Sequence, residues 1–407
     1  MPASNRRMAG LPASAAYLLY AGGSALFFAS YSTLANVYRI RVAHLDALQL
    51  VLVGTSLELA VFLFEVPTGV LADSVSRRLS VLVGLALTGA GYVLEGALPL
   101  FGTIVLAQLL WGVGSTFESG AVDAWVTDEI GEERAAAAFM RAAQVGQLAS
   151  LGGIVLASVL GRAGLAWPLL AGGMGFLVLT AVLGVAMTET GFAPAPHRAP
   201  GAAWRLRRTF VAGLRAARAR PVIRWILVIA LLVGAASEVF DRLWQARLLH
   251  HAAVVQRPLP LTGSIGLSGF FGVVAAVAML LSLAGTEFAR RRVDATDHVA
   301  TARALMMLTA GLSLSVAGFG VFGDVRVGLT CYFVAIMIRR VNAPLTRAWL
   351  NQSATADVRA TLFSFANQVD ALGQIAGGPL LGVLALKAVM PWAFAACAGL
   401  LVPAVLV

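Results

Sequence analysis

The sequence predicts an all-α polytopic membrane protein, with about twelve transmembrane helices in two pseudo-symmetric six-helix halves. Hydrophobic residues make up 59% of its 407 residues and charged residues only 12%, whereas soluble domains carry about 25% charged residues. Apolar windows long enough to cross a bilayer, roughly 20 residues, recur along the whole chain. A polar segment near the middle separates these windows into two sets, which indicates two helical bundles.

The apolar windows place the expected spans along the chain. The first window follows Arg6 and Arg7 and is too long for the apolar core of a signal peptide, so we interpret it as a span. Each window has the length that a membrane helix needs. The expected spans are 13–38, 47–70, 80–98, 101–125, 135–160, 165–188, 222–248, 262–287, 299–322, 326–350, 360–385 and 389–407.

The predicted domains are an N-terminal six-helix bundle at 1–188, a basic cytoplasmic linker at 189–221 and a C-terminal six-helix bundle at 222–407. Within the linker, the stretch from Trp204 to Arg220 fits either an amphipathic helix on lipid headgroups or a flexible basic connection. Arginine-rich loops mark the cytoplasmic side of membrane proteins. We therefore expect a bacterial-type plasma (inner) membrane protein with both termini in the cytoplasm.

A short internal repeat relates the two halves. Arg134 precedes the pair Gly152-Gly153, and Arg359 precedes the pair Gly377-Gly378 by the same number of residues. The match is short enough to arise by chance, but it falls at corresponding places in both sets of spans. Two related bundles predict a cavity between them at mid-depth in the membrane.

Composition excludes several classes of function. The net charge of +10 comes from short loops and the linker, without the aromatic-interleaved basic face that nucleic acid needs. Cys331 and Cys397 lie in apolar runs and are expected to be small core residues. The adjacent pair His250-His251 has no acidic metal-ligand motif beside it. We expect no metal, no cofactor, no nucleic acid partner and no enzyme activity.

The loop that joins the second and third spans carries unusual chemistry. Asp73 and the pair Arg77 and Arg78 lie where the chain leaves the membrane, turns and re-enters. A carboxylate and an arginine pair in such a loop can lock helices together through ion pairs and release them again. The alternative is that the arginines only set the topology, as positive residues on the cytoplasmic side do. The spacing to Glu65 and Gly69 favours the latch.

Charged residues also occur inside the expected spans, where a charge at the bilayer centre costs roughly 2.5–3.5 kcal/mol. Glu238 and Arg242 share a helix face, and Asn367, Asp370 and Gln374 form a stripe along another. Such side chains either join helices by hydrogen bonds or line a wet cavity, where a carboxylate can load and release a proton. The proton-coupling candidates are Glu238, Asp241, Asp370 and Glu118. The substrate-cavity candidates are Tyr31, Glu58, Gln144, Gln147, Arg242, Asn367 and Gln374.

Residues 69–78, with the sequence GVLADSVSRR, resemble the signature loop between the second and third helices of the major facilitator superfamily. Ser74 stands where that family has a basic residue, and Ser76 where it has glycine. The run SGAVDAWVTD at 119–128 resembles a bacterial branch of drug-efflux-like transporters. The resemblance implies a conformational latch, whose residues would be Gly69, Asp73, Arg77 and Arg78 with the partner candidates Asp128, Glu129 and Glu133.

The latch loop, the buried carboxylates and the aromatic spans together predict a secondary active transporter that works by alternating access. We expect proton-coupled efflux of hydrophobic or amphipathic small molecules, of the multidrug or antibiotic type. The alternatives are an importer or uniporter of a small metabolite and, in another class, a non-transporting receptor or scaffold or a membrane-embedded enzyme. The expected partners are a small-molecule substrate, protons and the lipid bilayer, and we expect a monomer.

Overall fold

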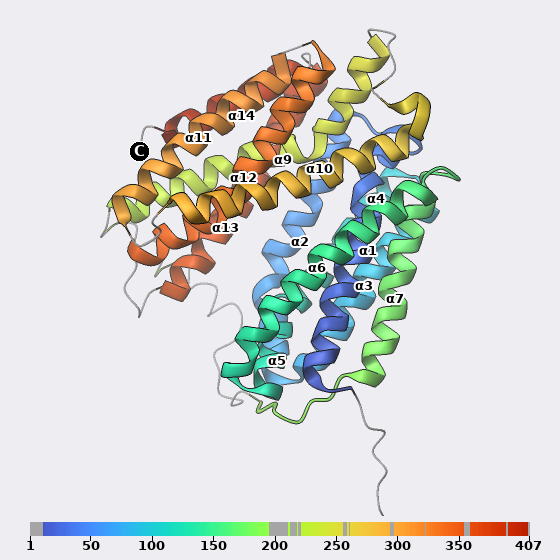
Figure 1. Cartoon of the computed structure of the whole chain (residues 1–407), viewed down its shortest axis with the longest axis vertical. Coiled ribbons are helices and arrows are strands. Elements are labelled where there is room, and N and C mark those ends of the chain that lie inside the picture. Colours follow the sequence, from blue (N-terminus) through green and yellow to red (C-terminus); the bar gives the residue numbers. More distant parts are fainter. Residues whose placement is uncertain are drawn as a thin grey trace, which may run out of the picture. The chain divides into compact units, whose positions relative to one another are not determined.

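In the computed structural model, the described part of the chain consists of α-helices joined by short loops and turns (Figure 1). The structure describes residues 11–194, 211, 218, 221–254, 259, 261–293, 297–321, 323–353, 359–387 and 390–405. The helices are α1 (Ala13–Arg41), α2 (Ala47–Ser74), α3 (Arg77–Ala97), α4 (Phe101–Glu118), α5 (Ala121–Ile130), α6 (Glu132–Leu160), α7 (Trp167–Ala186), α9 (Pro221–Val254), α10 (Thr262–Arg292), α11 (His298–Val321), α12 (Val325–Ser353), α13 (Arg359–Lys387) and α14 (Met390–Val405). These elements confirm the predicted all-α class.

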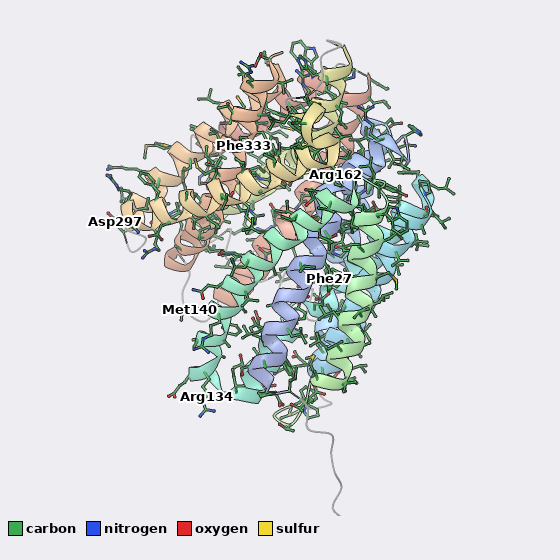
Figure 2. The ribbon with its side chains drawn as sticks, turned by 45° about the vertical axis from the view of Figure 1, so that its right-hand side comes forward. Phe27, Arg134, Met140, Arg162, Asp297 and Phe333 are labelled. Carbon is green, nitrogen blue, oxygen red and sulfur yellow. The ribbon has the colours of Figure 1, made fainter. Side chains whose placement is uncertain are left out.

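Within the described residues, nine helices are long and apolar enough to cross a membrane: α1, α2, α3, α6, α7, α9, α10, α11 and α13. Arg134 near the start of α6 and Arg162, two residues beyond its end, are both exposed and flank its apolar stretch (Figure 2). The sequence predicted one continuous span over residues 101–125, but the structure has two helices there, α4 and α5. Gly120 separates them with a φ of +72°, a left-handed conformation that glycine adopts without steric strain.

The chain forms two compact units. The first contains residues 1–34 and 63–202, and the second contains residues 35–62 and 203–407. Helices α1 and α2 are therefore shared. Residues 13–34 of α1 and residues 63–74 of α2 belong to the first unit, and the rest of both helices belongs to the second. The expected domain boundaries at 189–221 stay a prediction, and most of that linker lies outside the described residues.

The internal repeat has a structural counterpart in each unit. A Cβ atom at Gly153 of α6 would meet the backbone of Leu26 and the side chain of Ala29 on α1. A Cβ atom at Gly377 of α13 would meet Ala235 on α9. In both halves the glycine pair thus lets a helix approach the first helix of its own half closely, as small residues do between membrane helices.

Close backbone packing also joins α3 to α4 in the first unit. A Cβ atom at Gly84 would lie 2.7 Å from the carbonyl oxygen of Gly114, and one at Gly114 would lie 2.7 Å from the carbonyl oxygen of Gly84. The absence of side chains at these two positions lets α3 and α4 approach closely, as small residues do between membrane helices. This close contact also fixes the positions of the side chains that α3 and α4 present to the cavity described below.

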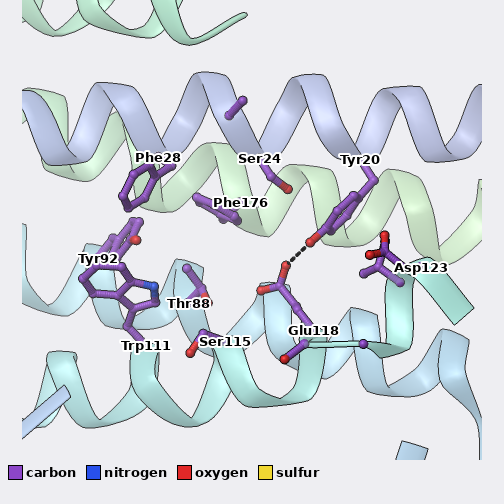
Figure 3. Close-up of a pocket in the computed structure, with 14 residues that line it drawn as sticks. Tyr20, Ser24, Phe28, Thr88, Tyr92, Trp111, Ser115, Glu118, Asp123 and Phe176 are labelled. Atoms are coloured by element: carbon purple, nitrogen blue, oxygen red, sulfur yellow. Dashed lines mark hydrogen bonds between the residues drawn. The ribbon is translucent and has the colours of Figure 1, made fainter. Parts of the chain in front are cut away.

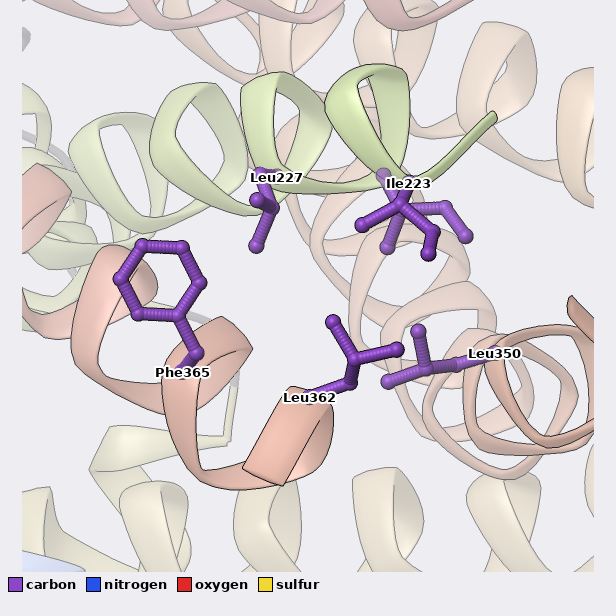
Figure 4. Close-up of a cluster of buried hydrophobic side chains, with 6 residues drawn as sticks. Ile223, Leu227, Leu350, Leu362 and Phe365 are labelled. Carbon is purple, nitrogen blue, oxygen red and sulfur yellow. The ribbon is translucent and has the colours of Figure 1, made fainter. Parts of the chain in front are cut away.

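The second unit has an apolar core where α9, α12 and α13 meet. Ile223 and Leu227 on α9 pack with Leu350 on α12 and with Leu362 and Phe365 on α13 (Figure 4). All five side chains are buried. Fully burying one such side chain contributes roughly 1.5–3 kcal/mol, so this cluster holds the three helices together.

Candidate functional site

The first unit contains a cavity of about 500 Å³ between α1, α3, α4, α5 and α7 (Figure 3). That volume lies within the usual range for sites that bind drug-sized ligands. Polar and aromatic side chains share its wall. The lining residues are Tyr20, Ser24, Ala25, Phe28, Thr88, Tyr92, Trp111, Ser115, Glu118, Ser119, Gly120, Val122, Asp123 and Phe176.

Two carboxylates lie at one end of this cavity. The hydroxyl of Tyr20 donates to Oε2 of Glu118 at 2.7 Å, and the hydroxyl of Tyr17 donates to Oδ1 of Asp123 at 3.1 Å. The helix break at Gly120 places the end of α4 and the start of α5 around the same space, which brings both acids to the cavity. Neither acid forms an ion pair within the described part of the chain.

Aromatic rings form the other end of the cavity (Figure 3). Tyr92 lies 5.4 Å from Trp111 and 5.6 Å from Phe176 between ring centroids, and both pairs are edge-on. Phe28 lies 5.8 Å from Trp111. Behind them, Tyr31 stacks on Tyr92 with parallel rings and a centroid distance of 3.6 Å. Contacts on several sides hold the wall rigid.

A buried carboxylate supports this aromatic wall from behind. Glu95 is completely buried and accepts hydrogen bonds from the hydroxyl of Tyr31 at 2.8 Å and from the amide of Gln108 at 2.9 Å. The same amide donates to the Tyr31 hydroxyl at 2.9 Å. This network fixes the ring of Tyr31 against Tyr92. Glu95 itself does not line the cavity.

The predicted latch residues Asp73, Arg77 and Asp128 lie together. The Arg77 guanidinium donates to the Asp128 carboxylate and, at 3.3 Å, to the carbonyl oxygen of Ala124. It also lies 3.7 Å from Oδ1 of Asp73 and over the ring of Phe192. One guanidinium therefore connects the end of α2 to α5 and to the chain beyond α7.

Ser76 and Arg78 contact a residue that the sequence interpretation did not single out. The Ser76 hydroxyl accepts from the backbone N–H of Leu79 and so caps α3, and it donates to Oε2 of Glu189 at 2.6 Å. Oε1 of Glu189 accepts from the Arg78 backbone N–H at 2.9 Å, and the Arg78 side chain donates to the carbonyl oxygen of Gly184. Serine at position 76 therefore makes two hydrogen bonds that glycine could not.

Glu129 binds the chain that follows α7. One carboxylate oxygen accepts from the backbone N–H groups of Thr190 at 2.5 Å and Gly191 at 2.7 Å, and the other accepts from the hydroxyls of Thr188 and Thr190 at 3.0 Å each. Glu129 lies beyond the predicted span 101–125. Partial burial opposes ionisation, but these hydrogen bonds outweigh it and lower the pKa of Glu129 below its ordinary value.

The remaining two latch candidates are placed differently. A Cβ atom at Gly69 would meet no atom within 4 Å among the described residues, so this glycine is not required by close packing. Glu133 is exposed at the start of α6. Neither residue joins the contacts of Arg77 with Asp73 and Asp128 described above. Their expected roles stay predictions.

The second unit holds a different charged cluster, on α2, α9 and α12. Glu238 is 2% exposed and accepts from Nε of Arg242 at 3.0 Å. Asp241, one turn along the same helix, takes both guanidinium arms of Arg339 on α12, one of them at 2.7 Å. A Cβ atom at Gly54 of α2 would overlap the Glu238 carboxylate and the Arg242 guanidinium. Glycine there makes room for the ion pair.

The other predicted carboxylates of this unit lack an arginine partner in the described residues. Asp370 accepts from the amide of Gln374 at 2.9 Å, one turn away on α13. Glu58 on α2 is partly buried and lies in the electrostatic field of Glu238, Arg242 and Asp370. Asn367, the first residue of the predicted stripe, is exposed.

The first-unit cavity contains few of the predicted residues. Of the proton-coupling candidates, only Glu118 lines it, and Tyr31 lies directly behind its wall. Gln144 and Gln147 are exposed on α6 and do not line it. Six of the other thirteen lining residues are tyrosine, serine or threonine, whose hydroxyls carry no charge signal in an apolar helix. No group of three or more His, Cys, Asp or Glu in the described ranges could hold a metal ion.

Comparisons with known proteins agree with this architecture. The chain matches the Major Facilitator Superfamily over residues 13–367. It is 21% identical, over 344 residues, to the uncharacterized MFS-type transporter YxaM of Bacillus subtilis (strain 168), with 83% of this chain and 81% of that protein covered.

Solved transporters share the fold. The nucleoside transporter NupG matches with a TM-score of 0.76 and 12% identity, covering 97% of this chain and 98% of that chain. The POT family transporter PepTSo matches with a TM-score of 0.71 and 13% identity over 97% and 96% of the two chains. A bacterial homolog of the human lysosomal transporter Spinster matches with a TM-score of 0.66 and 13% identity over 100% and 95%. At these identities the likeness concerns the fold alone.

Proposed function

Because this chain belongs to the Major Facilitator Superfamily, a family of multi-pass membrane transporters, we propose that it is a secondary active transporter that exports hydrophobic or amphipathic small molecules in exchange for protons. Family membership sets aside the non-transporting receptor or scaffold that the sequence left open, and it points away from an enzyme. We place the protein in a bacterial inner membrane as a monomer with cytoplasmic termini, since its arginine-rich turns fit the cytoplasmic side.

The observation that carries the proposal is the cavity in the first unit. Its aromatic end can bury an apolar body, and its acidic end can bind a polar group or a proton. Alternating access exposes such a site to one side of the membrane and then to the other. A site of this kind needs no cofactor, because the two-state movement itself performs transport.

Glu118 is the residue that we assign to proton coupling in the first unit. Its described hydrogen-bond donor is the neutral Tyr20 hydroxyl, so no arginine holds its charge in place. Among the second-unit candidates, Asp370 is in the same position, with Gln374 as its donor. Glu238 and Asp241 are each bound to an arginine, whose positive charge compensates that of the carboxylate.

The proton gradient supplies enough free energy for this task. One proton moving down a single pH unit releases about 1.4 kcal/mol, and a potential of 100 mV adds about 2.3 kcal/mol. Together they sustain a gradient of several hundredfold for a neutral solute. In the proposed cycle the contacts of Arg77 with Asp73 and Asp128 form in one access state and break in the other.

The test is transport by the purified protein in proteoliposomes with an imposed pH gradient. We expect flux to follow the gradient, and Glu118→Gln and Asp370→Asn each to reduce the gradient-dependent part. Glu287→Gln is the matched control, because Glu287 pairs with Arg290 and Arg291 on the surface at the end of α10. Flux that ignores the gradient in all four proteins would reject proton coupling. Accumulation in cells rather than extrusion would select the importer instead.

A further inference from the structure

We propose that the cavity of the first unit selects organic cations, with a planar aromatic body against its aromatic end and a protonated amine or similar cationic nitrogen against Glu118. The inference rests on the proposed transport function and names the substrate class of the same site. Three observations support it: the sign of the charges that face the cavity, the hydrogen-bond partners of those charges, and the aromatic rings at the opposite end.

The charges that face the cavity have one sign. Glu118 and Asp123 line it, and none of the described lining residues is Arg, Lys or His. The attraction between unit charges about 4 Å apart is roughly 1 kcal/mol in water and rises as the effective dielectric falls. An anionic substrate would meet two carboxylates without a compensating cation, whereas a cationic substrate would itself supply the counterion that the two carboxylates lack.

The two carboxylates have capacity left for a ligand. Each accepts one hydroxyl, from Tyr20 or from Tyr17, whereas a carboxylate offers about four acceptor positions. The neutral donors orient the oxygens and leave the charge uncompensated. A third acid, Glu95, is completely buried behind the wall and takes two donors of its own, so it does not compete for the ligand.

The aromatic end suits the same molecule. Trp111 is held edge-on to the completely buried Tyr92 at 5.4 Å. Together with Phe28, 5.8 Å from Trp111, it presents the aromatic surface on which a planar aromatic body can stack. Aromatic faces also attract cations, by about 0.5–2 kcal/mol according to how well the site excludes water. Between the two ends, the Ser24 hydroxyl has no hydrogen-bond partner among the described residues and is available to a polar substituent (Figure 3).

A matched set of probes tests this assignment on the wild-type protein in nanodiscs. Naphthalene-1-methylamine, naphthalene-1-methanol and 1-naphthoic acid share one aromatic body and differ in the charge of the head group. By titration calorimetry at pH 7, we expect the amine to bind about tenfold more tightly than the alcohol, as a charge-assisted contact predicts, and the acid to bind least. Equal affinities, or tighter binding of the acid, would overturn the proposal.

Substitutions of the two lining carboxylates test which of them causes the preference for the amine. Glu118→Gln should lower the affinity for the amine by about tenfold and leave the alcohol within about twofold, and Glu287→Gln should change neither. Amine selectivity that survives both Glu118→Gln and Asp123→Asn would also overturn the assignment. The wild-type comparison remains decisive if a variant does not fold.

The inference and the proposed proton coupling can fail separately. If the protein prefers the amine but its flux does not follow the pH gradient, the proposed coupling alone is rejected. If the pH gradient drives flux of the alcohol and the protein does not prefer the amine, this inference alone is rejected.

Discussion

The two units use their carboxylates in opposite ways. In the first unit Glu118 and Asp123 are bound by tyrosine hydroxyls and line a cavity. In the second unit Glu238 and Asp241 are bound by Arg242 and Arg339. Glu118 is partly buried and Glu238 is buried, and an isolated charge in such a place is costly. The difference is the charge of the partner.

That difference separates two roles. A carboxylate bound by a guanidinium has its charge satisfied and mainly holds helices in register. A carboxylate bound by a hydroxyl keeps an uncompensated charge, or a proton, and can exchange one for the other. The comparison predicts that substitutions in the second unit act mostly on stability, and that substitutions in the first unit act mostly on binding and transport.

The largest effect is expected from Arg242→Ala. The change leaves the Glu238 carboxylate, which is 2% exposed, without its cation, and breaking a buried ion pair in this way costs about 3–5 kcal/mol. The free energy of unfolding of the purified protein in detergent measures it. The double change Glu238→Gln with Arg242→Met is the control and should recover most of the loss. If the single and double changes were equally mild, the ion pair would not be structural.

A smaller effect is expected from Gly54→Ala. The added methyl group would overlap the Glu238 carboxylate and the Arg242 guanidinium, and overpacking of this kind costs about 1–3 kcal/mol. Gly69→Ala is a matched control on the same helix, because its methyl group would enter open space. Alanine favours a helix over glycine by about 1 kcal/mol, so the control should unfold at the same or a higher temperature. If Gly54→Ala and Gly69→Ala destabilised the protein equally, the result would contradict tight packing of α2 against the ion pair.

The sequence predicted the helices well, because an apolar segment long enough to cross a membrane must satisfy its own backbone hydrogen bonds and therefore forms a helix. It missed the break at Gly120, since one glycine inside an apolar run does not reveal its φ. It also found the pairs that lie close in the chain: Glu238 with Arg242, and Asp370 with Gln374.

Partners far apart in the chain could not be predicted in the same way. The binding of Asp241 by Arg339, or of Ser76 by Glu189, depends on which helices are neighbours, and one sequence does not fix this. The hydroxyl-lined cavity was missed for a further reason. Tyr20, Ser24 and Thr88 are each ordinary residues in a membrane helix, and only the fold shows that they line the same cavity as Glu118.

Glu129 provides a test of the first unit outside its spans. Its pKa is lowered, so its ionised form stabilises the folded state above the pKa of the unfolded chain, and this contribution is lost as the pH falls through the lower folded value. We expect Glu129→Gln to cost about 1 kcal/mol at pH 7, a modest figure because the group is partly exposed. The difference from wild type should shrink below about pH 4.5. A difference that grew on acidification would contradict the assigned hydrogen bonds.

The smallest effect on stability is expected from Glu118→Gln, and it is the sharpest test of the comparison. The Tyr20 hydroxyl, now 2.7 Å from Oε2, can donate equally well to an amide oxygen, and the change removes a charge that no cation balances. We therefore expect the free energy of unfolding to change by less than about 0.5 kcal/mol, measured in detergent beside Arg242→Ala. A loss as large as that of Arg242→Ala would mean that Glu118 is structural, and the two units would then use their carboxylates alike.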